Sequence, residues 1–495
     1  MNENKPRRAI ALMTRPAKQL APEMAACLAA LLYHALAASA APEPVRLHPD
    51  NPHYFLWRGK PTILLTASEH YGAVINLDFD YGRYLDELKK HRLNLARVFS
   101  GAYRERAGTF HIAGNTLAPA AGRFLCPWAR SAIPAQEGRT RFDLTRWDET
   151  YFARLKRFVA QADEHGVIVE LVFFCIMYDD SVWSASPMNA RNNVNGIGQV
   201  ERNQVYAGRD ARLLDVQQAM VRKIVTELNP FANVYFEVCN EPHERDGVTE
   251  DWNNRIIQTV VETEAKLSNQ HLIAQGFPGT QTALAGVNRH VSILNFHYAT
   301  ARTVQVNYGW NRVVAFDETG GSDRSDRRYR LQAWEFILGG GGVFDHLDFS
   351  FTAGHEDGSA PLPAGTPGGG SAELRRQLGI LKEFIEGFDF LRMTPDSTTV
   401  RACRAVEVQE PPATGKEITA HCLAERGRAY AVHVRGGIQT ELTLALPSGR
   451  YQVDWMNPRS GRVEKSESFL QEKGDGTVLS PPYIEDIAAR IVRAR

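Results

Sequence analysis

Cysteine is scarce in this chain of 495 residues, and neither sign of charge predominates. Six cysteines are too few to hold a disulfide-rich fold together at this length. Lysine plus arginine totals 57, as does aspartate plus glutamate, so the formal net charge is zero. Nucleic-acid-binding proteins usually carry a basic excess, so no nucleic-acid partner is expected. No uninterrupted apolar run reaches about 18 residues, which excludes a multi-pass membrane protein.

Signatures of several cofactor and metal chemistries are also missing. The sequence contains no CxxC pair or Cys/His cluster with zinc spacing. No GxGxxG follows the first predicted strand, which makes a doubly wound nucleotide-binding fold the weaker alternative. A metal-dependent barrel hydrolase would need His-x-His on its first strand, where only a lone His70 follows the strand. We therefore expect neither a cofactor nor a metal.

Length and composition are those of a globular protein with more than one domain. Hydrophobic residues make up 43% and charged residues 23%, which excludes a largely disordered chain. At about 100–200 residues per domain, the chain has room for two or three domains. Local patterns divide it into a targeting segment at residues 1–40, a catalytic barrel at 45–392 and a small β domain at 395–495.

The first forty residues have the pattern of a cleaved signal. Basic residues come first, then an apolar run, then small residues that fit a cleavage site: Arg7, Arg8, Arg15 and Lys18, residues 24–36, and Ala38-Ser39-Ala40. This pattern predicts a secreted or periplasmic protein whose mature chain has no membrane span. A start at Met13 or Met24, or a disordered or membrane-tethering N-terminus, remains an alternative.

A repeated unit of apolar strand, loop and amphipathic helix runs through the middle of the chain. Eight candidate strands are residues 62–68, 94–100, 167–174, 233–240, 271–277, 292–297, 312–318 and 342–351. Helical patterns are residues 80–91, 150–165, 210–228, 251–267, 325–338 and 372–388. Nearly continuous apolar strands indicate a sheet covered on both faces. Eight such units predict an α/β fold, a (β/α)8 TIM barrel.

Extra length lies in loops that follow predicted strands, and different patterns flank the barrel. The loops are residues 103–145, 178–205 and 353–371, on the side where such barrels build their sites. A hairpin at 54–61 is expected to close the barrel floor. Short alternating runs at 429–434, 440–446, 451–457 and 462–469 predict a small antiparallel β-sandwich. Cys403 and Cys422 flank one short segment, and could pair or remain buried thiols.

Two glutamates end the fourth and seventh predicted strands. Glu241 lies in Asn240-Glu241-Pro242, and Glu318 follows Asp317. A single carboxylate at a strand end is usually solvated or caps a helix. Two of them at the carboxyl rim of a barrel can converge over one pocket. Glycosidic bond hydrolysis needs this pair, one acid for the leaving oxygen and one carboxylate for the oxocarbenium-like centre.

These residues resemble those of the clan A glycoside hydrolases, and of glycoside hydrolase family 5 (cellulase-like) in particular. The resemblance covers residues 45–390. It implies a retaining enzyme that cleaves β-glycosidic bonds of a poly- or oligosaccharide by double displacement, with Glu241 as acid/base and Glu318 as nucleophile. Their carboxyl groups are then expected about 5–5.5 Å apart. The sequence at 449–461 resembles the β-sandwich, named for collagen binding, that follows such barrels, and it could bind a ligand or stabilise the barrel.

Other positions match the family one at a time. Arg97, inside the second strand, resembles the arginine that bonds the nucleophile, although it could also pair with Glu237 inside the barrel. Asn240 resembles the asparagine that contacts the sugar 2-hydroxyl. His297 and Tyr298 end the sixth strand, where the family places an aromatic residue near the nucleophile. Of these two, Tyr298 is expected at the nucleophile because a phenol donates to a carboxylate at neutral pH.

Rim residues supply further candidates for substrate contact. Glu69 and His70 follow the first strand and could bond the sugar or cap the next helix. Trp183 and Trp310 lie in rim segments and could be sugar platforms or core residues.

The chain departs from the family in having no histidine at the end of strand three and no tryptophan at strand eight. A non-catalytic carbohydrate-binding barrel is the alternative function. The sequence leaves the sugar, its linkage, exo or endo action and the oligomeric state open.

Overall fold

The computed structural model describes residues 43–134, 140–279, 281–321, 323–406 and 418–494. The expected targeting segment at residues 1–40 lies outside these ranges. Among the described residues, no helix combines the length and the apolar character that a membrane span requires.

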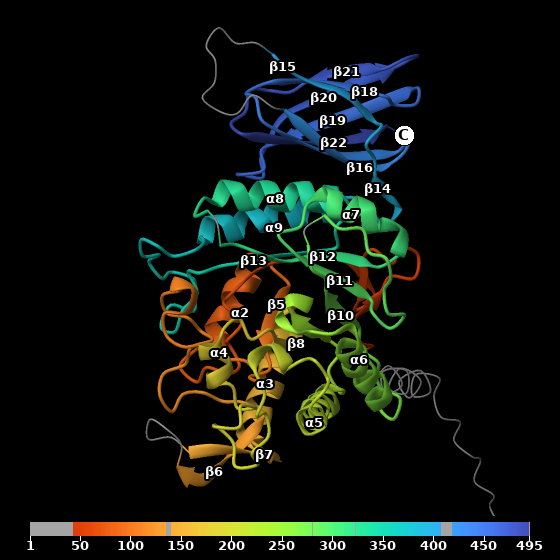
Figure 1. Ribbon diagram of the computed structural model, residues 1–495. Coiled ribbons are helices and arrows are strands. Elements are labelled where there is room, and N and C mark those ends of the chain that lie inside the picture. Colours follow the sequence, from red (N-terminus) through yellow and green to blue (C-terminus); the bar gives the residue numbers. More distant parts are fainter. Residues whose placement is uncertain (1–42, 135–139, 280, 322, 407–417, 495) are drawn as a thin grey trace, which may run out of the picture. The chain divides into compact units, whose positions relative to one another are not determined.

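An eight-stranded parallel sheet forms the barrel (Figure 1). Its strands are, in spatial order, β4 (Leu64–Ser68), β13 (Val343–Leu347), β12 (Val313–Thr319), β11 (Ile293–His297), β10 (Ile273–Gly276), β9 (Val234–Asn240), β8 (Ile168–Cys175) and β5 (Leu95–Phe99). Every predicted strand is present, shortened or shifted at its ends. The (β/α)8 prediction is confirmed.

The first and last strands of this order, β4 and β5, close the barrel mainly through side chains. The backbone N–H of Asn94 donates to the Leu65 carbonyl at 3.1 Å, and the backbone N–H of Leu65 donates to the side-chain oxygen Oδ1 of Asn94 at 3.0 Å. The Thr66 hydroxyl donates to the Leu95 carbonyl at 2.6 Å. The hydrogen bonds of Asn94 therefore connect β4 to β5, as backbone hydrogen bonds connect the other neighbouring strands.

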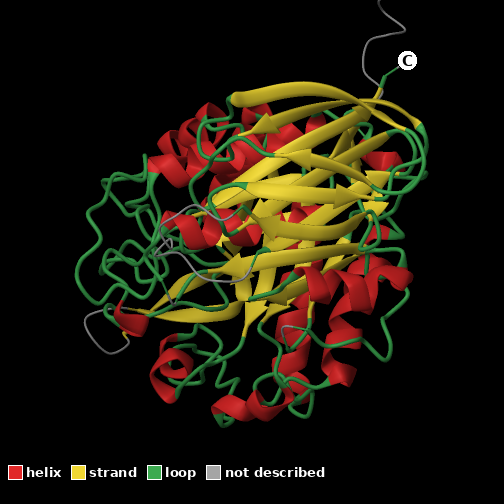
Figure 2. Ribbon diagram, turned by 90° about the horizontal axis from the view of Figure 1, so that it is seen from above, coloured by secondary structure: helices red, strands yellow, loops and turns green. Residues whose placement is uncertain are grey.

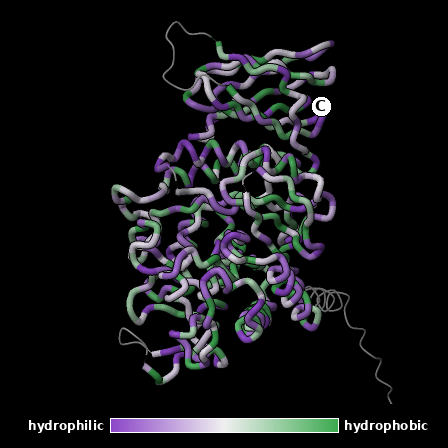
Figure 3. Tube along the Cα trace, viewed as in Figure 1, coloured by the Kyte–Doolittle hydropathy of each residue, from purple (hydrophilic) through white to green (hydrophobic). Residues whose placement is uncertain are grey.

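Amphipathic helices cover the outer face of the sheet. The predicted ones are α2 (Tyr81–Lys90), α3 (Glu149–His165), α5 (Ala211–Leu228), α6 (Glu250–Glu264), α8 (Asp326–Leu338) and α9 (Ala372–Glu386). Hydrophilic and hydrophobic residues alternate along them in Figure 3. Asp80, Asp148 and Asp210 accept hydrogen bonds from the first free N–H groups, which fixes three helix starts. Gly166, in the left-handed region at φ 75°, ends α3.

The sequence patterns did not predict two short helices and one hairpin. Short helices α4 (Asp180–Ala185) and α7 (Ala301–Asn307) lie in connections after strands. A hairpin of β6 (Trp128–Pro134) and β7 (Thr140–Trp147) stands inside the long loop after β5. That loop is therefore partly ordered by its own strand pairing.

The barrel floor is closed as predicted. Strands β1 (Arg46–Leu47), β2 (Phe55–Trp57) and β3 (Lys60–Thr62) form a small antiparallel sheet. Phe55 and Trp57 pack in one buried cluster with the first residues of the barrel strands. This apolar plug leaves the opposite, carboxyl end of the strands for the site.

The C-terminal part is an antiparallel β-sandwich of a six-stranded and a three-stranded sheet (Figure 2). The strands are β14 (Thr394–Pro395), β15 (Val400–Ala405), β16 (Thr419–Glu425), β17 (Ala429–Arg435), β18 (Thr440–Leu444), β19 (Gly449–Met456), β20 (Val463–Gln471), β21 (Gly476–Leu479) and β22 (Asp486–Arg493). Its predicted class is confirmed. The described cysteines, Cys403 and Cys422 among them, are free thiols.

A buried ion cluster links the barrel to the sandwich. Arg330 of α8 donates to Asp486 of β22 at 2.8 Å and to neighbouring Glu485 at 2.8 Å. His433 of β17 lies 3.1 Å from the same Asp486 carboxylate. The sandwich is thus held to α8 by charge-assisted hydrogen bonds, away from the pocket at the strand ends.

Candidate active site

Glu241 and Glu318 meet at the carboxyl end of the barrel because of two local backbone features. Glu241, directly after β9, has φ 50° and so leaves the strand direction. On β12 the register against β11 shifts, so that Phe296 pairs with Phe316 but His297 pairs with Glu318. Strand side chains normally alternate between faces, but this bulge lets both Asp317 and Glu318 reach Arg97.

His297 lies between the two glutamates. Its Nδ1 is 2.9 Å from Glu241 Oε1 and 3.5 Å from Glu318 Oε1. One carboxyl oxygen of each glutamate and one ring nitrogen of His297 all lie within 4.8 Å of one another. The two carboxylates are therefore near neighbours in one pocket.

Glu318 is held by a phenol and a guanidinium. The Tyr71 hydroxyl donates to Glu318 Oε2 at 2.9 Å, and Arg97 Nη1 lies 3.7 Å from the same oxygen. The guanidinium also lies over the Tyr71 ring, 4.7 Å from its centroid. A carboxylate with a fixed cation and a fixed hydrogen-bond donor near one oxygen is well oriented.

Glu241 is held by a different phenol and by His297. The Tyr178 hydroxyl donates to Glu241 Oε2 at 2.6 Å. Asn240 Nδ2 donates to the Tyr178 oxygen at 3.1 Å, and Asn240 Oδ1 accepts from Arg97 at 2.7 Å. Asn240 therefore connects the surroundings of both glutamates.

Arg97 contacts both of the carboxylates considered for it from the sequence, Glu318 and Glu237. Besides approaching Glu318, it donates through Nε and Nη2 to Glu237 Oε2 at 3.0 and 2.6 Å. Asp317 is 3.4 Å away and Glu170 is 4.0 Å away, and all these groups are buried. Arg97 is thus the central cation of a carboxylate cluster that lies beneath the pocket.

Burial and charge move the pKa values of the pocket groups apart. Burial lowers the pKa of His297, but the charges of Glu318, Asp317 and Glu241 outweigh it and raise this pKa to about 10. Burial raises the pKa of Glu241, but the hydrogen bond and charge of His297 and the Tyr178 hydroxyl lower it to about 2. These shifts make Glu241 a carboxylate paired with a His297 imidazolium.

Backbone strain is concentrated at this pocket. Nine non-glycine residues in the described chain have positive φ, and five of them line the pocket: Tyr71, Phe110, His111, Glu241 and Tyr298. A non-glycine residue in the left-handed region costs on the order of 1–3 kcal/mol. Such residues persist where the surrounding structure holds them for a purpose, so the clustering independently marks the pocket as functional.

The cavity around the glutamates has a volume of about 360 Å³. Its walls include the rings of Phe99, Phe110, Tyr178 and Phe349, and its rim includes His70 and Glu105. His70 Nε2 lies 3.2 Å from Glu105 Oε2, and Tyr103 and Asn115 donate to the same carboxylate. A polar floor with aromatic walls suits a ligand that has hydroxyl groups and apolar faces.

The structure brings most of the predicted site residues together. Glu241, Glu318, Asn240, His70 and Tyr298 line the cavity, and Arg97 and His297 contact the two glutamates. Tyr298 is half-exposed, and its backbone N–H, not its phenol, bonds to the Glu318 carbonyl. Tyr71 occupies the place expected for Tyr298, because the left-handed backbone of Tyr298 turns its ring towards Gly321.

Three predicted contacts are not placed at the cavity. Glu69 is buried and accepts from the Gly72 and Ala73 N–H groups at 3.0 and 2.9 Å, so it caps its own turn; burial raises its pKa to about 7. Trp183 is buried and donates to the Val200 carbonyl at 2.9 Å. Trp310 lies in a 3-10 turn, Tyr308–Trp310, after α7 and packs against the core. Trp183 is therefore a core residue, and Trp310 is half-buried against the core.

Sequence reasoning missed Tyr71, Tyr178 and Glu105. Tyr71 stands three residues after β4, and Tyr178 stands three residues after β8, so both are at the expected rim. Their position just after a predicted strand was the only feature of the sequence that could have indicated a role in the site. The side-chain direction depends on φ 59° at Tyr71, which no local pattern predicts.

Among the described residues, two sets of groups have a spacing that could hold a metal ion. One is Glu241, His297 and Glu318, and the other is Glu170, Glu237 and Asp317. In the second set Arg97 already supplies the cation. In the first, a metal would have to displace the proton from His297, because a ligating imidazole nitrogen must be unprotonated.

The fold is that of glycoside hydrolases built as a TIM barrel followed by a β-sandwich. Three solved structures carry this likeness. A candidate glycoside hydrolase from Bacteroides vulgatus has a TM-score of 0.63 at 15% identity, covering 92% of this chain and 83% of its own. A glycoside hydrolase has a TM-score of 0.61 at 12% identity, with 91% and 97% covered. A glycoside hydrolase family 5 protein from Bacteroides vulgatus has a TM-score of 0.58 at 12% identity, with 91% and 93% covered.

Sequence comparison gives less. The family described as a domain of unknown function, DUF6298, matches residues 112–229, which run from the loop after β5 through α5. No curated protein matches the chain. The likeness to known proteins is therefore one of fold, and the activity must be argued from the site.

Proposed function

We propose that the protein is a retaining glycoside hydrolase that cleaves β-glycosidic bonds of a poly- or oligosaccharide. One observation carries the proposal: oxygens of Glu241 and Glu318 lie within 4.8 Å of each other across one pocket. Retaining enzymes have carboxyl groups about 5–5.5 Å apart, whereas inverting enzymes separate them by about 6.5–9.5 Å to admit a water. The spacing supports double displacement.

Glu318 is the proposed nucleophile. The charge of Arg97 and the donated hydrogen bond of Tyr71 support this role, because both hold the carboxylate in one orientation. In the first step a Glu318 oxygen forms a bond to the anomeric carbon as the bond to the leaving oxygen breaks. Water then cleaves the glycosyl-enzyme ester and regenerates Glu318.

Glu241 is the proposed acid/base, acting together with His297. Their 2.9 Å contact holds one proton between the two groups, and the pair gives this proton to the leaving oxygen through Glu241 as the leaving oxygen becomes basic. Once Glu318 is bound to the sugar its charge is gone, so His297 loses one of the charges that raise its pKa. Glu241 is then free to take a proton from the attacking water. Glu241 and His297 are close enough to titrate as a pair rather than one by one.

The substrate is proposed to be a carbohydrate, on the combination of two carboxylates, an asparagine and aromatic walls in one cavity. Asn240 is proposed to contact the hydroxyl next to the anomeric carbon. Export to the periplasm or medium is proposed from the basic and apolar N-terminal segment alone.

The test is sugar release by the full chain from aryl β-glycosides and from plant and microbial β-glycans, beside Glu318→Ala. Release by the wild type and loss in the variant support the proposal, and NMR must show that the first-formed sugar keeps its anomeric configuration. An inverted product would remove the retaining mechanism. Saturable glycan binding with no release, in wild type and variant alike, would instead establish the non-catalytic carbohydrate-binding barrel.

A further inference from the structure

A row of aromatic rings runs along one wall of the proposed catalytic pocket. Centroids of neighbouring rings are 5.0, 5.7, 6.2 and 5.0 Å apart in the order Tyr71, Phe99, Tyr103, Tyr178 and Phe110. The Tyr71 hydroxyl donates to Glu318, and the Tyr178 hydroxyl donates to Glu241. Phe110 therefore stands beyond Tyr178, at the end of the row that belongs to Glu241.

Phe110 is the exposed member of this row. It is 43% exposed, whereas Tyr71, Phe99 and Tyr103 are each 3% exposed or less. Among the large apolar residues of the described chain, only Phe110 and Tyr298 are both aromatic and exposed, and both line this cavity. A single exposed apolar side chain is ordinary, but exposed rings gathered at one cavity indicate a ligand that covers them.

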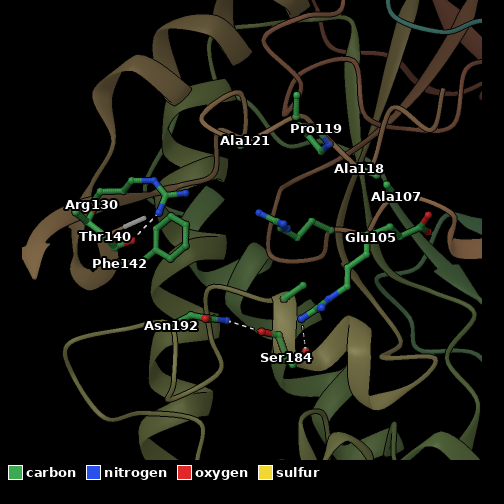
Figure 4. Close-up of a pocket in the computed structure, with 14 residues that line it drawn as sticks. Glu105, Ala107, Ala118, Pro119, Ala121, Arg130, Thr140, Phe142, Ser184 and Asn192 are labelled. Atoms are coloured by element: carbon green, nitrogen blue, oxygen red, sulfur yellow. Dashed lines mark hydrogen bonds between the residues drawn. The ribbon is translucent and has the colours of Figure 1, made fainter. Parts of the chain in front are cut away.

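The loop that carries Phe110 holds it in a strained conformation. Phe110 has φ 54° and ψ 17°, and a bulky residue is a genuine outlier in this left-handed region. The Glu105 N–H donates to the Leu117 carbonyl at 2.8 Å, which ties the loop ends together; Figure 4 shows these ends at Ala107 and Ala118. A strained backbone that presents a ring to solvent lowers stability, so the ring is retained for a ligand contact.

The order of the rings indicates which part of a ligand Phe110 meets. In a retaining glycosidase the nucleophile bonds to the anomeric carbon of one sugar, and the acid protonates the oxygen of the leaving group. Phe110 packs edge to face on Tyr178, with an angle of 86° between the rings, and Tyr178 contacts the proposed acid. The ring is thus on the side of the leaving group, one ring beyond the acid.

We propose that Phe110 is the binding platform for the first sugar of the leaving group. It then determines the preference of the enzyme for oligosaccharides over simple glycosides. One face of a β-linked pyranose ring is rich in C–H groups, and packing it on the exposed phenyl ring removes apolar surface of both from water. The assignment to the leaving group rests on the proposed function, whereas glycan binding at Phe110 does not.

The first test is isothermal titration of the full-length Glu318→Ala protein, which prevents turnover during the measurement. The probes are cellotetraose, mannotetraose, xylotetraose and the methyl β-glycoside of each sugar. Phe110→Gly removes the ring and accepts the left-handed backbone, Phe110→Leu keeps apolar bulk without a flat ring, and Phe110→Tyr keeps a ring. Leu470→Ala, at an exposed residue of β20, is the matched control. Circular dichroism and thermal unfolding check that each variant folds.

We expect at least one tetrasaccharide to bind about tenfold or more tightly than its methyl glycoside, because only the longer ligand reaches Phe110. Phe110→Gly loses this preference, Phe110→Leu keeps part of it, and Phe110→Tyr and Leu470→Ala keep all of it. Equal affinities for long and short probes, binding of no tetrasaccharide, or a preference that survives in the folded Phe110→Gly variant overturns the proposal.

A second test asks on which side of the cleaved bond Phe110 acts, with Glu318 intact. The glycosyl-enzyme is formed from the 2-deoxy-2-fluoro glycosyl fluoride of the sugar that the wild type releases. An acceptor disaccharide then occupies the leaving-group side, its hydroxyl attacks the anomeric carbon, Glu241 takes the hydroxyl proton and the bond to Glu318 breaks. We expect Phe110→Gly to reduce the acceleration by acceptor about tenfold. An acceleration equal to that of the wild type overturns the assignment to the leaving group.

Failure of this inference can be told apart from failure of the proposed function. Sugar release that Glu318→Ala abolishes, together with tetrasaccharide binding that does not depend on Phe110, leaves the glycosidase standing without this platform. Tetrasaccharide binding that depends on Phe110, with no sugar release from any glycan, leaves the platform standing in a carbohydrate-binding barrel.

Discussion

Among the described residues, two clusters of three groups lie in this barrel, one buried among its strands and one in the pocket at their carboxyl ends, and they differ in their cation. Glu170, Glu237 and Asp317 are buried around Arg97, whereas Glu241 and Glu318 flank His297 in the pocket. The spacing within each set is alike, with ligand atoms within 4.8 Å of one another. An arginine keeps its charge at any working pH, whereas a histidine can give its proton away. The buried cluster is therefore built to stay fixed, and the pocket cluster to change protonation.

The fixed cluster also supplies the pocket's geometry. Arg97 reaches up to Glu318 and across to Asn240 while it holds Glu237. Burial raises the pKa of Glu170 well above its usual value, and raises that of Glu237. Similar residue types thus perform different work because one set is closed from solvent and the other is open to it.

The largest expected effect is on the open cluster. Glu318→Ala should lower kcat by about 10⁴-fold or more, since it removes the proposed nucleophile. Glu241→Ala should lower it by about 10²–10⁴-fold on substrates with poor leaving groups and much less on those with good ones. Steady-state kinetics on one aryl glycoside series checks both. A flat dependence on leaving group in both variants would contradict the assignment of Glu241 as the acid.

Removing the cation of the closed cluster should act on stability first. Arg97→Met leaves buried carboxylates without their cation, and we expect a loss of about 3–5 kcal/mol in the free energy of unfolding. Urea denaturation measures it. Arg58→Met is the matched control, because the Arg58–Asp163 pair at 2.8 Å is surface-exposed and is worth less than about 1 kcal/mol. Equal losses in both variants would show that the buried cluster is not organised by Arg97.

Two tyrosines lie near Glu318, and they are expected to differ in function: Tyr71 positions the Glu318 carboxylate, whereas Tyr298 only lines the cavity. Tyr71→Phe removes the hydroxyl that donates to Glu318, and a hydrogen bond to a charged group is worth about 1.5–3 kcal/mol, or about 10–100-fold in kcat/KM. Tyr298→Phe should change kcat/KM by less than about threefold, since no hydrogen bond joins its phenol to Glu318 among the described contacts. The reverse ranking would return Tyr298 to the place at the nucleophile that the family pattern predicts.

The smallest effect is a shift with pH. The pKa of His297 is about 10 in the folded protein, above its ordinary 6.5. Its contribution to stability is therefore complete below about pH 6.5 and is lost as pH rises through about 10. The pKa of Glu241 is lowered to about 2, so its contribution is present above its ordinary 4.5 and is lost as pH falls towards 2.

Thermal unfolding of the wild type and of His297→Asn between pH 6 and pH 10 measures this contribution. The difference in Tm between the two proteins should shrink steadily as pH rises. His355→Asn, at an exposed histidine, is the control and should show no such trend. A difference that stays constant over this range would mean that His297 is not charged in the folded protein.

The barrel strands, Glu241, Glu318 and Arg97 were predictable because each is unusual for its surroundings. Apolar runs of fixed length mark strands, and a charge inside or at the end of such a run is costly unless the fold uses it. The Tyr71–Glu318 contact spans 247 residues and depends on a left-handed backbone and a strand bulge. Neither leaves a local pattern. The β6–β7 hairpin was not predicted for a similar reason, because its strands pair with register shifts and their apolar and polar residues do not alternate regularly.

The five residues with a left-handed backbone around the pocket position its side chains, and they lower the stability of the fold. Each left-handed side-chain-bearing residue lowers the stability of the whole fold by an amount that glycine would largely avoid. Glycine at Tyr71 or Glu241 would relieve the strain and remove the group that the strain positions. A more heat-resistant version of this protein is therefore to be sought outside the pocket, in the sandwich or on the helices. Chains selected for stability alone would tend to lose the site first.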